Sequence, residues 1–151
     1  MTTNETTTRS VPDTIERELV LPHPIERVWR AITDTTELAA WFGDTATLEL
    51  RPGAEGMFTW GDDHSPMVVE AVEEPHRFAY WWTSGASQSV TPEYRTLVDF
   101  RLEPTADGGT RLRLVESGFA ALANGPKQHA DNVDGWDIEL GELTTHLGDG
   151  S

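Results

Sequence analysis

Residues 21–42 read LPHPIERVWRAITDTTELAAWF, and this stretch predicts two short consecutive helices. Pro24 suits the first position of a helix, because a helix start leaves that N–H unpaired in any case. Behind it, apolar residues recur at i, i+3, i+4 and i+7, the spacing of one helix stripe: Ile25, Val28, Trp29 and Ile32. Asp34, with Glu37 three residues later, predicts the start of a second helix, which Gly43 can end.

Outside this stretch apolar residues alternate with polar ones, which is the period of strands with one buried face. One strand, residues 15–21, precedes the helices. Further strands, separated by turn residues, are expected at 45–51, 56–60, 67–73, 77–83, 94–103 and 110–117. The short turns, clearest in Asp107-Gly108-Gly109, predict an antiparallel meander. The polar stretch 84–92 has no period, and we interpret it as a functional loop or lid.

Apolar residues near the C-terminus repeat at steps of 3, 4, 3 and 4, which predicts a long amphipathic helix: Val133, Trp136, Leu140, Leu143 and Leu147. Its apolar stripe must pack on something, and the sheet is the only large partner in the predicted set. The predicted fold class is therefore α+β: a curved antiparallel sheet wrapped around a long C-terminal helix, with two short helices after the first strand. Gly135 and Gly141 inside this helix cost about 1 kcal/mol each relative to Ala. We attribute both to close packing, the alternative being room for a ligand.

The composition sets limits on organisation and partners. With 151 residues, a single domain over 14–147 is expected, between a disordered N-terminal tail (1–13) and a C-terminal tail (148–151). Acidic side chains outnumber basic ones by 26 to 11, and the net charge of -15 repels nucleic acid and anionic lipid. The chain has no cysteine, which excludes disulfides and thiolate metal sites. Since no apolar run suits a membrane helix or a signal peptide, we expect a cytoplasmic protein with no nucleic-acid or membrane partner.

Short motifs follow one another along the chain: LPHPIERVWRAIT at 21–33, LAAWF at 38–42, EPHRFAYWW at 74–82, GTRL at 109–112, ESGF at 116–119 and GW at 135–136. In this order they resemble the START-like (SRPBCC) superfamily, whose helix-grip fold is also called Bet v 1-like. Within it the sequence is most similar to the homologues of the activator of the Hsp90 ATPase, C-terminal domain type, over nearly all of 15–147. The resemblance implies a cavity between sheet and long helix, often used to hold a small apolar molecule. It does not imply one activity, because the superfamily includes ligand binders, polyketide cyclases and co-chaperone domains of the stress response.

Aromatic side chains on neighbouring strands are the candidate binding surface. Phe78, Tyr80 and Trp82 share one face of their strand, because successive strand residues face opposite sides. An apolar pocket could be completed by Trp41, Phe42, Phe58, Trp60, Val98, Phe100, Leu114, Trp136 and Leu140. The alternative is that these side chains simply fill the core. The pattern leaves open which face of the sheet Phe58 and Trp60 take.

One polar residue joins this set. Glu116 follows Leu112 and Leu114 at period two, so we expect it on their face near the strand end, at the mouth of a cavity. A carboxylate there could bind a polar group of a ligand or act as a base with a raised pKa. The favoured alternative is a solvated or arginine-paired carboxylate at the end of the strand.

No residue pattern requires catalysis or a cofactor. The five histidines show no ligand spacing, the serines lie in no G-x-S-x-G elbow, and no P-loop or dinucleotide motif is present. We therefore assign no metal, cofactor or catalytic residue. Our first hypothesis is a non-enzymatic protein that binds a small, mainly apolar or aromatic molecule between the sheet and the long helix. The alternatives are a chaperone-associated interaction domain with a filled interior and an exposed apolar patch, and a polyketide-cyclase-like enzyme with Glu116 or a tyrosine as the acid-base group.

Overall fold

The computed structural model describes residues 13–83, 90–91 and 94–148. Apart from Asp13 and Gly148, the predicted tails lie outside these residues, and so does most of the predicted loop 84–92. The elements are, in chain order, β1 (Thr14–Leu21), α1 (Ile25–Thr33), α2 (Thr35–Trp41), β2 (Thr45–Thr47), β3 (Glu55–Trp60), β4 (Asp63–Glu73), β5 (Arg77–Trp82), β6 (Thr96–Pro104), β7 (Thr110–Ser117), the 3-10 turn η2 (Phe119–Ala121) and α3 (Gly125–Leu147).

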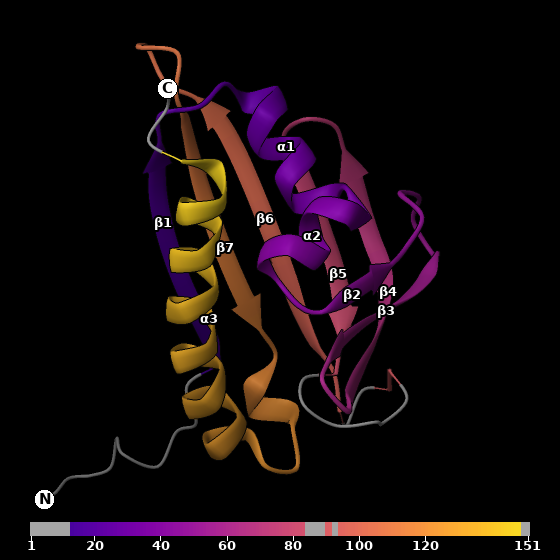
Figure 1. The fold of residues 1–151 in the computed structure, drawn as a ribbon. Helices are drawn as coiled ribbons and strands as arrows, with labels where there is room; N and C mark the ends of the chain where they lie inside the picture. The colour runs from indigo at the N-terminus through magenta and orange to yellow at the C-terminus, as the bar shows by residue number, and fades with distance from the viewer. Residues whose placement is uncertain (1–12, 84–89, 92–93, 149–151) are drawn as a thin grey trace, which may run out of the picture.

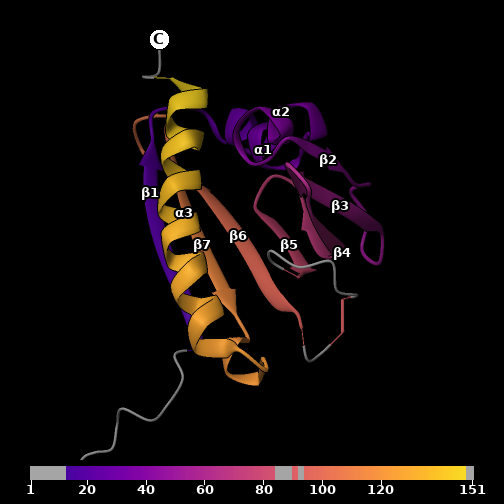
Figure 2. The same cartoon turned by 60° about the horizontal axis from the view of Figure 1, so that its bottom comes forward.

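The strands form one antiparallel sheet in the order β1-β7-β6-β5-β4-β3-β2. Strands that follow one another in the chain are neighbours from β2 to β7, and β1 pairs with β7, from Thr14 opposite Ser117 to Leu21 opposite Thr110. Figures 1 and 2 show the helices on one face of this curved sheet, with α3 along β1 and β7 and the pair α1 and α2 over β5 and β6. This is the helix-grip fold, as the sequence predicted.

Two strand boundaries differ from the sequence prediction by four residues, and the others agree to within two. β2 ends at Thr47 instead of 51, since its ladder with β3 ends at the pair of Thr47 and Met57. β4 begins at Asp63 instead of 67, since Gly61 adopts a φ of 59° and closes a two-residue turn from β3. The earlier start of β4 brings Ser65 into the sheet.

Helix α3 is longer at its N-terminal end than the apolar stripe suggested. It begins at Gly125, ahead of the first stripe residue Val133, and Pro126 lies in its first turn. Proline is compatible with this position because the first N–H groups of a helix have no partner within the helix. The added turns lie beside η2 and cover the end of β7, which decides the surroundings of the candidate site.

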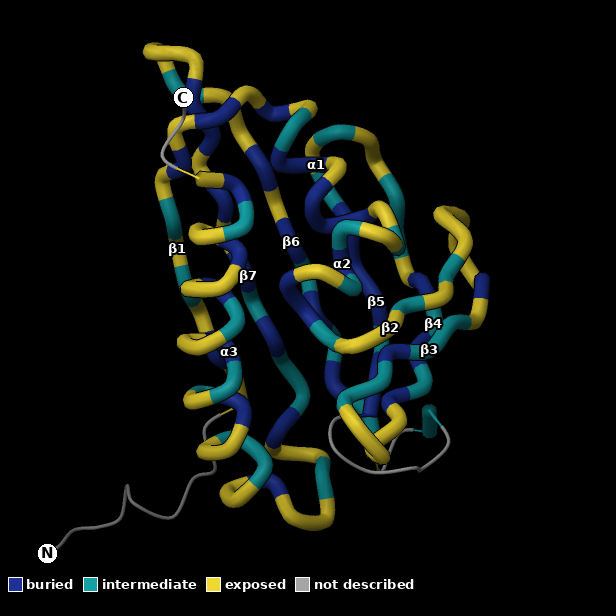
Figure 3. The backbone as a smooth tube through the Cα atoms, in the orientation of Figure 1, coloured by how far each residue is buried: buried dark blue, intermediate teal, exposed yellow. Residues whose placement is uncertain are grey.

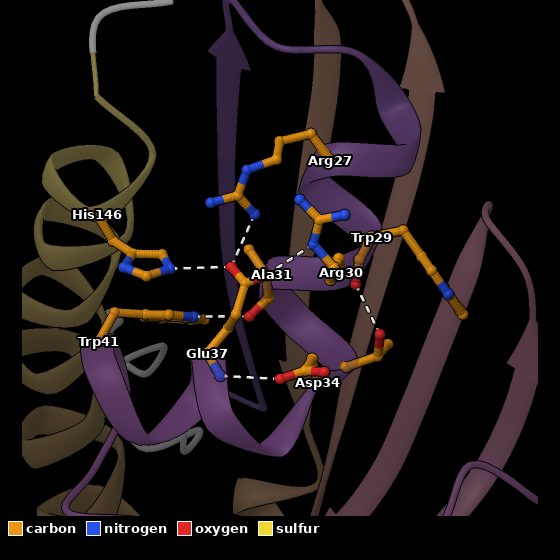
Figure 4. A network of polar contacts seen from close by, with 9 residues as sticks. Arg27, Trp29, Arg30, Ala31, Asp34, Glu37, Trp41 and His146 are labelled. Atoms are coloured by element: carbon orange, nitrogen blue, oxygen red, sulfur yellow. Dashed lines mark hydrogen bonds and ion pairs between the residues drawn. The ribbon is translucent and has the colours of Figure 1, made fainter.

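Glu37 connects α1, α2 and the C-terminal end of α3 (Figure 4). Its carboxylate accepts hydrogen bonds from Arg27 Nη1 at 2.7 Å and Arg30 Nε at 2.9 Å, and lies 2.9 Å from His146 Nε2. Its backbone N–H donates to the side chain of Asp34, the predicted N-cap, at 3.1 Å. Burial opposes ionisation of Glu37, but its bonds with His146, Arg27 and Arg30 hold its pKa below the ordinary value. This cluster fixes the three helices relative to one another.

The two faces of the sheet differ in burial. Figure 3 shows buried and exposed positions alternating along the strands. The buried apolar strand residues form one core cluster with those of the helices. The outer face carries ion pairs between strands, with N–O distances of 2.9 to 3.2 Å: Arg113–Glu16, Arg111–Glu18 and Arg77–Asp99. Among the described residues, no helix combines the length and the apolar character needed to cross a membrane.

Candidate functional site

A pocket of about 300 Å³ lies between α3 and the edge of the sheet where β3 and β5 end and β4 begins. We call it the α3 pocket. The sheet side and the residue after α2 contribute Phe42, Trp60, Asp63, Ser65 and Trp82, and α3 contributes Asn132, Gly135, Trp136, Ile138 and Glu139. The side chain of Ile138 is at its rim, 64% exposed.

Aromatic rings form the apolar walls of the α3 pocket. Phe42 stacks on Trp82 and on Trp136, with ring centroids 5.7 and 5.5 Å apart and interplanar angles of 25° and 23°. Trp60 meets Phe42 edge-on at 5.3 Å and Trp82 at 6.0 Å. Because each ring contacts at least two of the others, these walls are preformed, as is usual for sites that bind small molecules.

Glycine in α3 leaves space beside these walls. A Cβ atom placed on Gly135, which lines the pocket, would meet no heavy atom within 4 Å. Gly141, farther along the helix, likewise faces open space. Our expectation that close packing explains these two glycines is therefore wrong, because neither has a close neighbour on its Cβ side.

Glu116 lies behind the aromatic walls and is 0% exposed. Its carboxylate accepts hydrogen bonds from Trp136 Nε1 at 2.7 Å, Trp82 Nε1 at 2.9 Å, Asn132 Nδ2 at 3.0 and 3.1 Å, and the Thr96 hydroxyl. Trp82, Asn132 and Trp136 also line the α3 pocket. Glu116 therefore positions the lining of the pocket from the protein interior.

This position corrects the sequence-based expectations for Glu116, which placed it at a cavity mouth or, as the favoured alternative, in solvent or beside an arginine. Because α3 starts at Gly125, Asn132 and Trp136 cover the end of β7 and enclose the carboxylate. Burial raises the pKa of Glu116, while the hydrogen bonds from Thr96, Trp82, Trp136 and Asn132 lower it. Both indole partners can only donate, so the surroundings favour the ionised, acceptor-only form by hydrogen bonding and oppose it by burial.

Polar residues also line the α3 pocket, among them Ser65, Asp63 and Glu139. Ser65 is 1% exposed, and its Oγ has no hydrogen-bond partner. Burial raises the pKa of Glu139 to about 7, with a smaller contribution from Glu142, although a hydrogen bond with Trp60 lowers it. Asp63 lies exposed at the edge of the pocket. In the part of the chain that the structure describes, no three histidine or acidic side chains are arranged to bind a metal ion.

The sequence-predicted site residues separate into groups in the structure. The α3 pocket is lined by Phe42, Trp60, Trp82 and Trp136. A second region under α1 and α2 retains no free volume, and we call it the filled region; its lining includes Trp41, Phe58, Phe78, Tyr80 and Phe100. Elsewhere in the buried core lie Val98, Leu114 and Leu140. Phe58 and Trp60 both face inward, which answers the question that the sequence left open.

The sequence analysis missed the polar part of the pocket lining, although the signals were present. Ser65 precedes Met67 and Val69 at period two, but the predicted strand began only after Pro66. Asn132 and Glu139 lie four residues before and three residues after Trp136, which puts them on its side of the helix. Two further lining residues were also not proposed as binding residues: Asp63 and Ile138.

Comparisons with known proteins agree with this fold. The family model described as Activator of Hsp90 ATPase homolog 1-like protein matches residues 22–148. The solved structure of protein MLL2253 from Mesorhizobium loti is 26% identical, with a TM-score of 0.76, and the match covers 89% of this chain and 96% of that one. CalU16 from Micromonospora echinospora is 22% identical, with a TM-score of 0.68, over 89% of this chain and 76% of that one.

DynU16, a protein in the dynemicin biosynthetic locus, is similar over 90% of this chain, with 24% identity and a TM-score of 0.74. The present chain spans about half the length of DynU16, 47%. No curated protein matches the sequence. At these identities the likeness to DynU16 and CalU16 shows a shared fold.

Proposed function

This chain belongs to the Activator of Hsp90 ATPase homolog 1-like protein family, and from that premise we propose that it binds a small, mainly apolar or aromatic molecule in the α3 pocket. The ligand would lie between the sheet and α3, against Trp60, Trp82 and Trp136. The proposal gives Glu116 a positioning role, since its carboxylate holds the side chains of Trp82 and Trp136 without itself lining the pocket.

The observation that carries this proposal is the open pocket with preformed aromatic walls. Its volume of about 300 Å³ is at the lower end of the range in which small-molecule sites fall. Gly135 leaves space where a larger side chain would complete the core, while the neighbouring filled region has no space left. A protein whose only requirement was stability would gain from filling this space as well.

The other two hypotheses have weaker support. A chaperone-associated domain would need an exposed apolar patch, whereas the large exposed apolar residues of the described chain lie in four separate segments: Val20 in β1, Leu50 between β2 and β3, Tyr94 before β6, and Ile138 in α3. A cyclase-like reaction with Glu116 as its base would require the carboxylate to reach the substrate, and Glu116 is enclosed by its own hydrogen-bond donors. We therefore retain ligand binding as the proposed function.

The test fills the pocket without disturbing the core. In Gly135→Leu the new side chain enters the α3 pocket, and the change from glycine favours the helix. Gly141→Leu is the matched control, because it makes the same change on the same helix, at a residue that also faces open space but does not line the pocket. Isothermal titration calorimetry with naphthalene derivatives, anthraquinones and fatty acids measures binding, and mass spectrometry of the mixtures detects any conversion.

We expect saturable binding of at least one aromatic compound to the wild type and to Gly141→Leu, and a loss of binding in Gly135→Leu. Equal binding to all three proteins would place the ligand elsewhere and contradict the proposal. Absence of binding across the whole panel would favour the chaperone-associated hypothesis.

A further inference from the structure

We propose that the α3 pocket selects aromatic molecules that carry a protonated amine. This inference rests on the proposed function and adds to it the chemical class of the ligand. It depends on the signs of the charges around the pocket, on a buried hydroxyl without a partner, and on the chemistry of the aromatic walls.

The charged groups at the pocket all have the same sign. Of the ten described residues that line it, the ionisable ones are Asp63 and Glu139, and both are acidic. Glu116 adds a third carboxyl group immediately behind the lining, and its hydrogen-bond partners are neutral side chains. Burial raises the pKa of Tyr80 in the neighbouring filled region well above its ordinary value, and the charges of Glu116 and Glu139 raise it further.

Ser65 supplies an independent sign of a polar ligand group. Ser65 lines the pocket, and its Oγ is the one buried side-chain oxygen or nitrogen without a hydrogen-bond partner among the described residues. Such an atom costs about 1–3 kcal/mol when it stays unpaired. A ligand with an N–H or O–H group could donate to it, so the site suits a molecule that is not purely apolar.

The aromatic walls are compatible with a cation as well as with an aromatic ring. The faces of tryptophan rings attract cations through their electron density, and this attraction is larger where water is excluded. Trp60, Trp82 and Trp136 all line the pocket. A carboxylate ligand, by contrast, would meet Asp63 and Glu139 and find no basic side chain in the described lining.

The net charge of the chain acts in the same direction. At -15, the protein attracts cations and repels anions from solution before any specific contact is made. Electrostatic attraction of this kind raises association rates and depends on salt, so it adds to the local contacts without replacing them.

Three probes of similar size separate the contributions: naphthylmethylamine, naphthylmethanol and naphthoate, which are cationic, neutral and anionic at pH 7.5. We expect the amine to bind about tenfold more tightly than the alcohol, and the acid to bind most weakly of the three. In Glu139→Gln the preference for the amine over the alcohol should fall about threefold or more, while affinity for the alcohol is kept. Asp134→Asn, an exposed change of equal charge on α3, should leave the preference unchanged and serves as the control.

Two further measurements keep the test independent of any one variant. Asp63→Asn should lower the preference for the amine in the same direction as Glu139→Gln. Ser65→Ala should weaken the amine and the alcohol about threefold and leave methylnaphthalene, which has no donor, unaffected.

Proton release provides a readout that a structural role would not change. Glu139 shares the pocket lining with Asp63 of β4, forms a hydrogen bond with Trp60 of β3, and is influenced by Glu142 of its own helix. Glu116 of β7 lies behind the lining, hydrogen-bonded to Trp82 and Trp136. A bound ammonium favours the ionised form of Glu139, so amine binding near pH 7 should release protons, and its calorimetric enthalpy should vary with the ionisation enthalpy of the buffer. Binding of the alcohol should show no such dependence.

The outcomes distinguish the two proposals. If the three charged and neutral probes bind with equal affinity, the charge selection is wrong and the proposed function stands. If naphthoate binds best, the charge selection is reversed. If no probe binds to the wild type, and Gly135→Leu does not differ from Gly141→Leu, both proposals are overturned.

Discussion

The interior of this protein has two adjacent regions built from the same kind of side chain, and one is filled while the other is open. The filled region under α1 and α2 is lined by apolar side chains, and no free volume remains in it. The α3 pocket keeps about 300 Å³ although three tryptophans line it. Phe42 belongs to both regions and separates them.

The difference lies in the residues that accompany the aromatic rings. In the filled region, Ile32 and Leu38 of the short helices pack onto the rings of the sheet. In the α3 pocket the helix presents Gly135, Asn132 and Glu139 instead, and the sheet presents Ser65. Aromatic residues alone therefore do not indicate a binding site here; small and polar residues among them do.

Removing the Glu116 carboxylate should have the largest effect on the α3 pocket, because this group holds Trp82, Asn132 and Trp136 of its lining. Glu116→Ala leaves two indole N–H groups, an amide and a hydroxyl buried without their acceptor, and should lower the free energy of unfolding by about 5 kcal/mol in urea titrations. Glu116→Gln keeps one acceptor oxygen and should cost about half as much.

The matched control is Glu16→Ala on β1, whose exposed carboxylate pairs with Arg113. We expect a change within about 0.5 kcal/mol, because exposed ion pairs contribute little. A similarly small effect of Glu116→Ala would show that the carboxylate does not hold the pocket lining.

Truncation of two side chains on the same face of β3 compares the regions directly. Phe58 is 1% exposed and packs against Phe42 and Tyr80 at 5.0 and 5.6 Å between ring centroids, so Phe58→Ala should cost about 4 kcal/mol. Trp60 lies two residues on and lines the open pocket, where water can replace part of the ring. Trp60→Ala should cost about 2 kcal/mol in the same urea titration, although tryptophan is the larger side chain. If Trp60→Ala instead cost as much as Phe58→Ala in proportion to the size of the side chain removed, Trp60 would be fully packed and the pocket would be closed in solution.

The same pair of residues shows what could be predicted from the sequence. The fold was predictable because its signals are local: the stripe from Val133 to Leu147, the Asp34 cap and the Asp107-Gly108-Gly109 turn each determine one element. The division of the interior into a filled region and an open pocket was not predictable. Phe58 and Trp60 lie two residues apart on the same strand and both face inward, so the sequence pattern gives no difference between them. Whether space remains beside a ring depends on residues distant in the sequence, such as Gly135 opposite Trp60.

The shifted titration of Glu139 should make the stability of the pocket region depend on pH. Its pKa is about 7 in the folded protein against 4.5 for an unperturbed glutamate, so the folded state binds more protons than the unfolded state between these values. The free energy of unfolding therefore falls as pH rises through this window. Because Glu139 is only about half-buried, we expect a contribution of about 1–2 kcal/mol after allowance for solvent screening.

Glu139→Gln should accordingly be more stable than the wild type at pH 8 by this amount and equal to it at pH 4.5, as measured by urea unfolding. Asp134→Asn, which removes one charge from the same helix outside the pocket, should show the same small change at both pH values. If the two variants behave alike, the burial of Glu139 is not sufficient to shift its titration.

The smallest expected effect is the gain in stability from replacing a glycine of α3 by alanine, and it tests whether the α3 pocket is open in solution. Alanine in place of glycine inside a helix gains about 0.8 kcal/mol when the new methyl group meets no obstacle. Both Gly135 and Gly141 meet this condition, since a Cβ on either would have no heavy atom within 4 Å, yet only Gly135 faces the pocket. Gly135→Ala and Gly141→Ala should therefore raise the midpoint of urea unfolding equally. A loss of stability in Gly135→Ala alone would show that the aromatic walls close onto the helix in solution. An equal gain in the two variants would show that the space beside Trp60, Trp82 and Trp136 is open in solution. The glycine at residue 135 would then keep that space at the cost of helix stability, whereas the filled region keeps no such space.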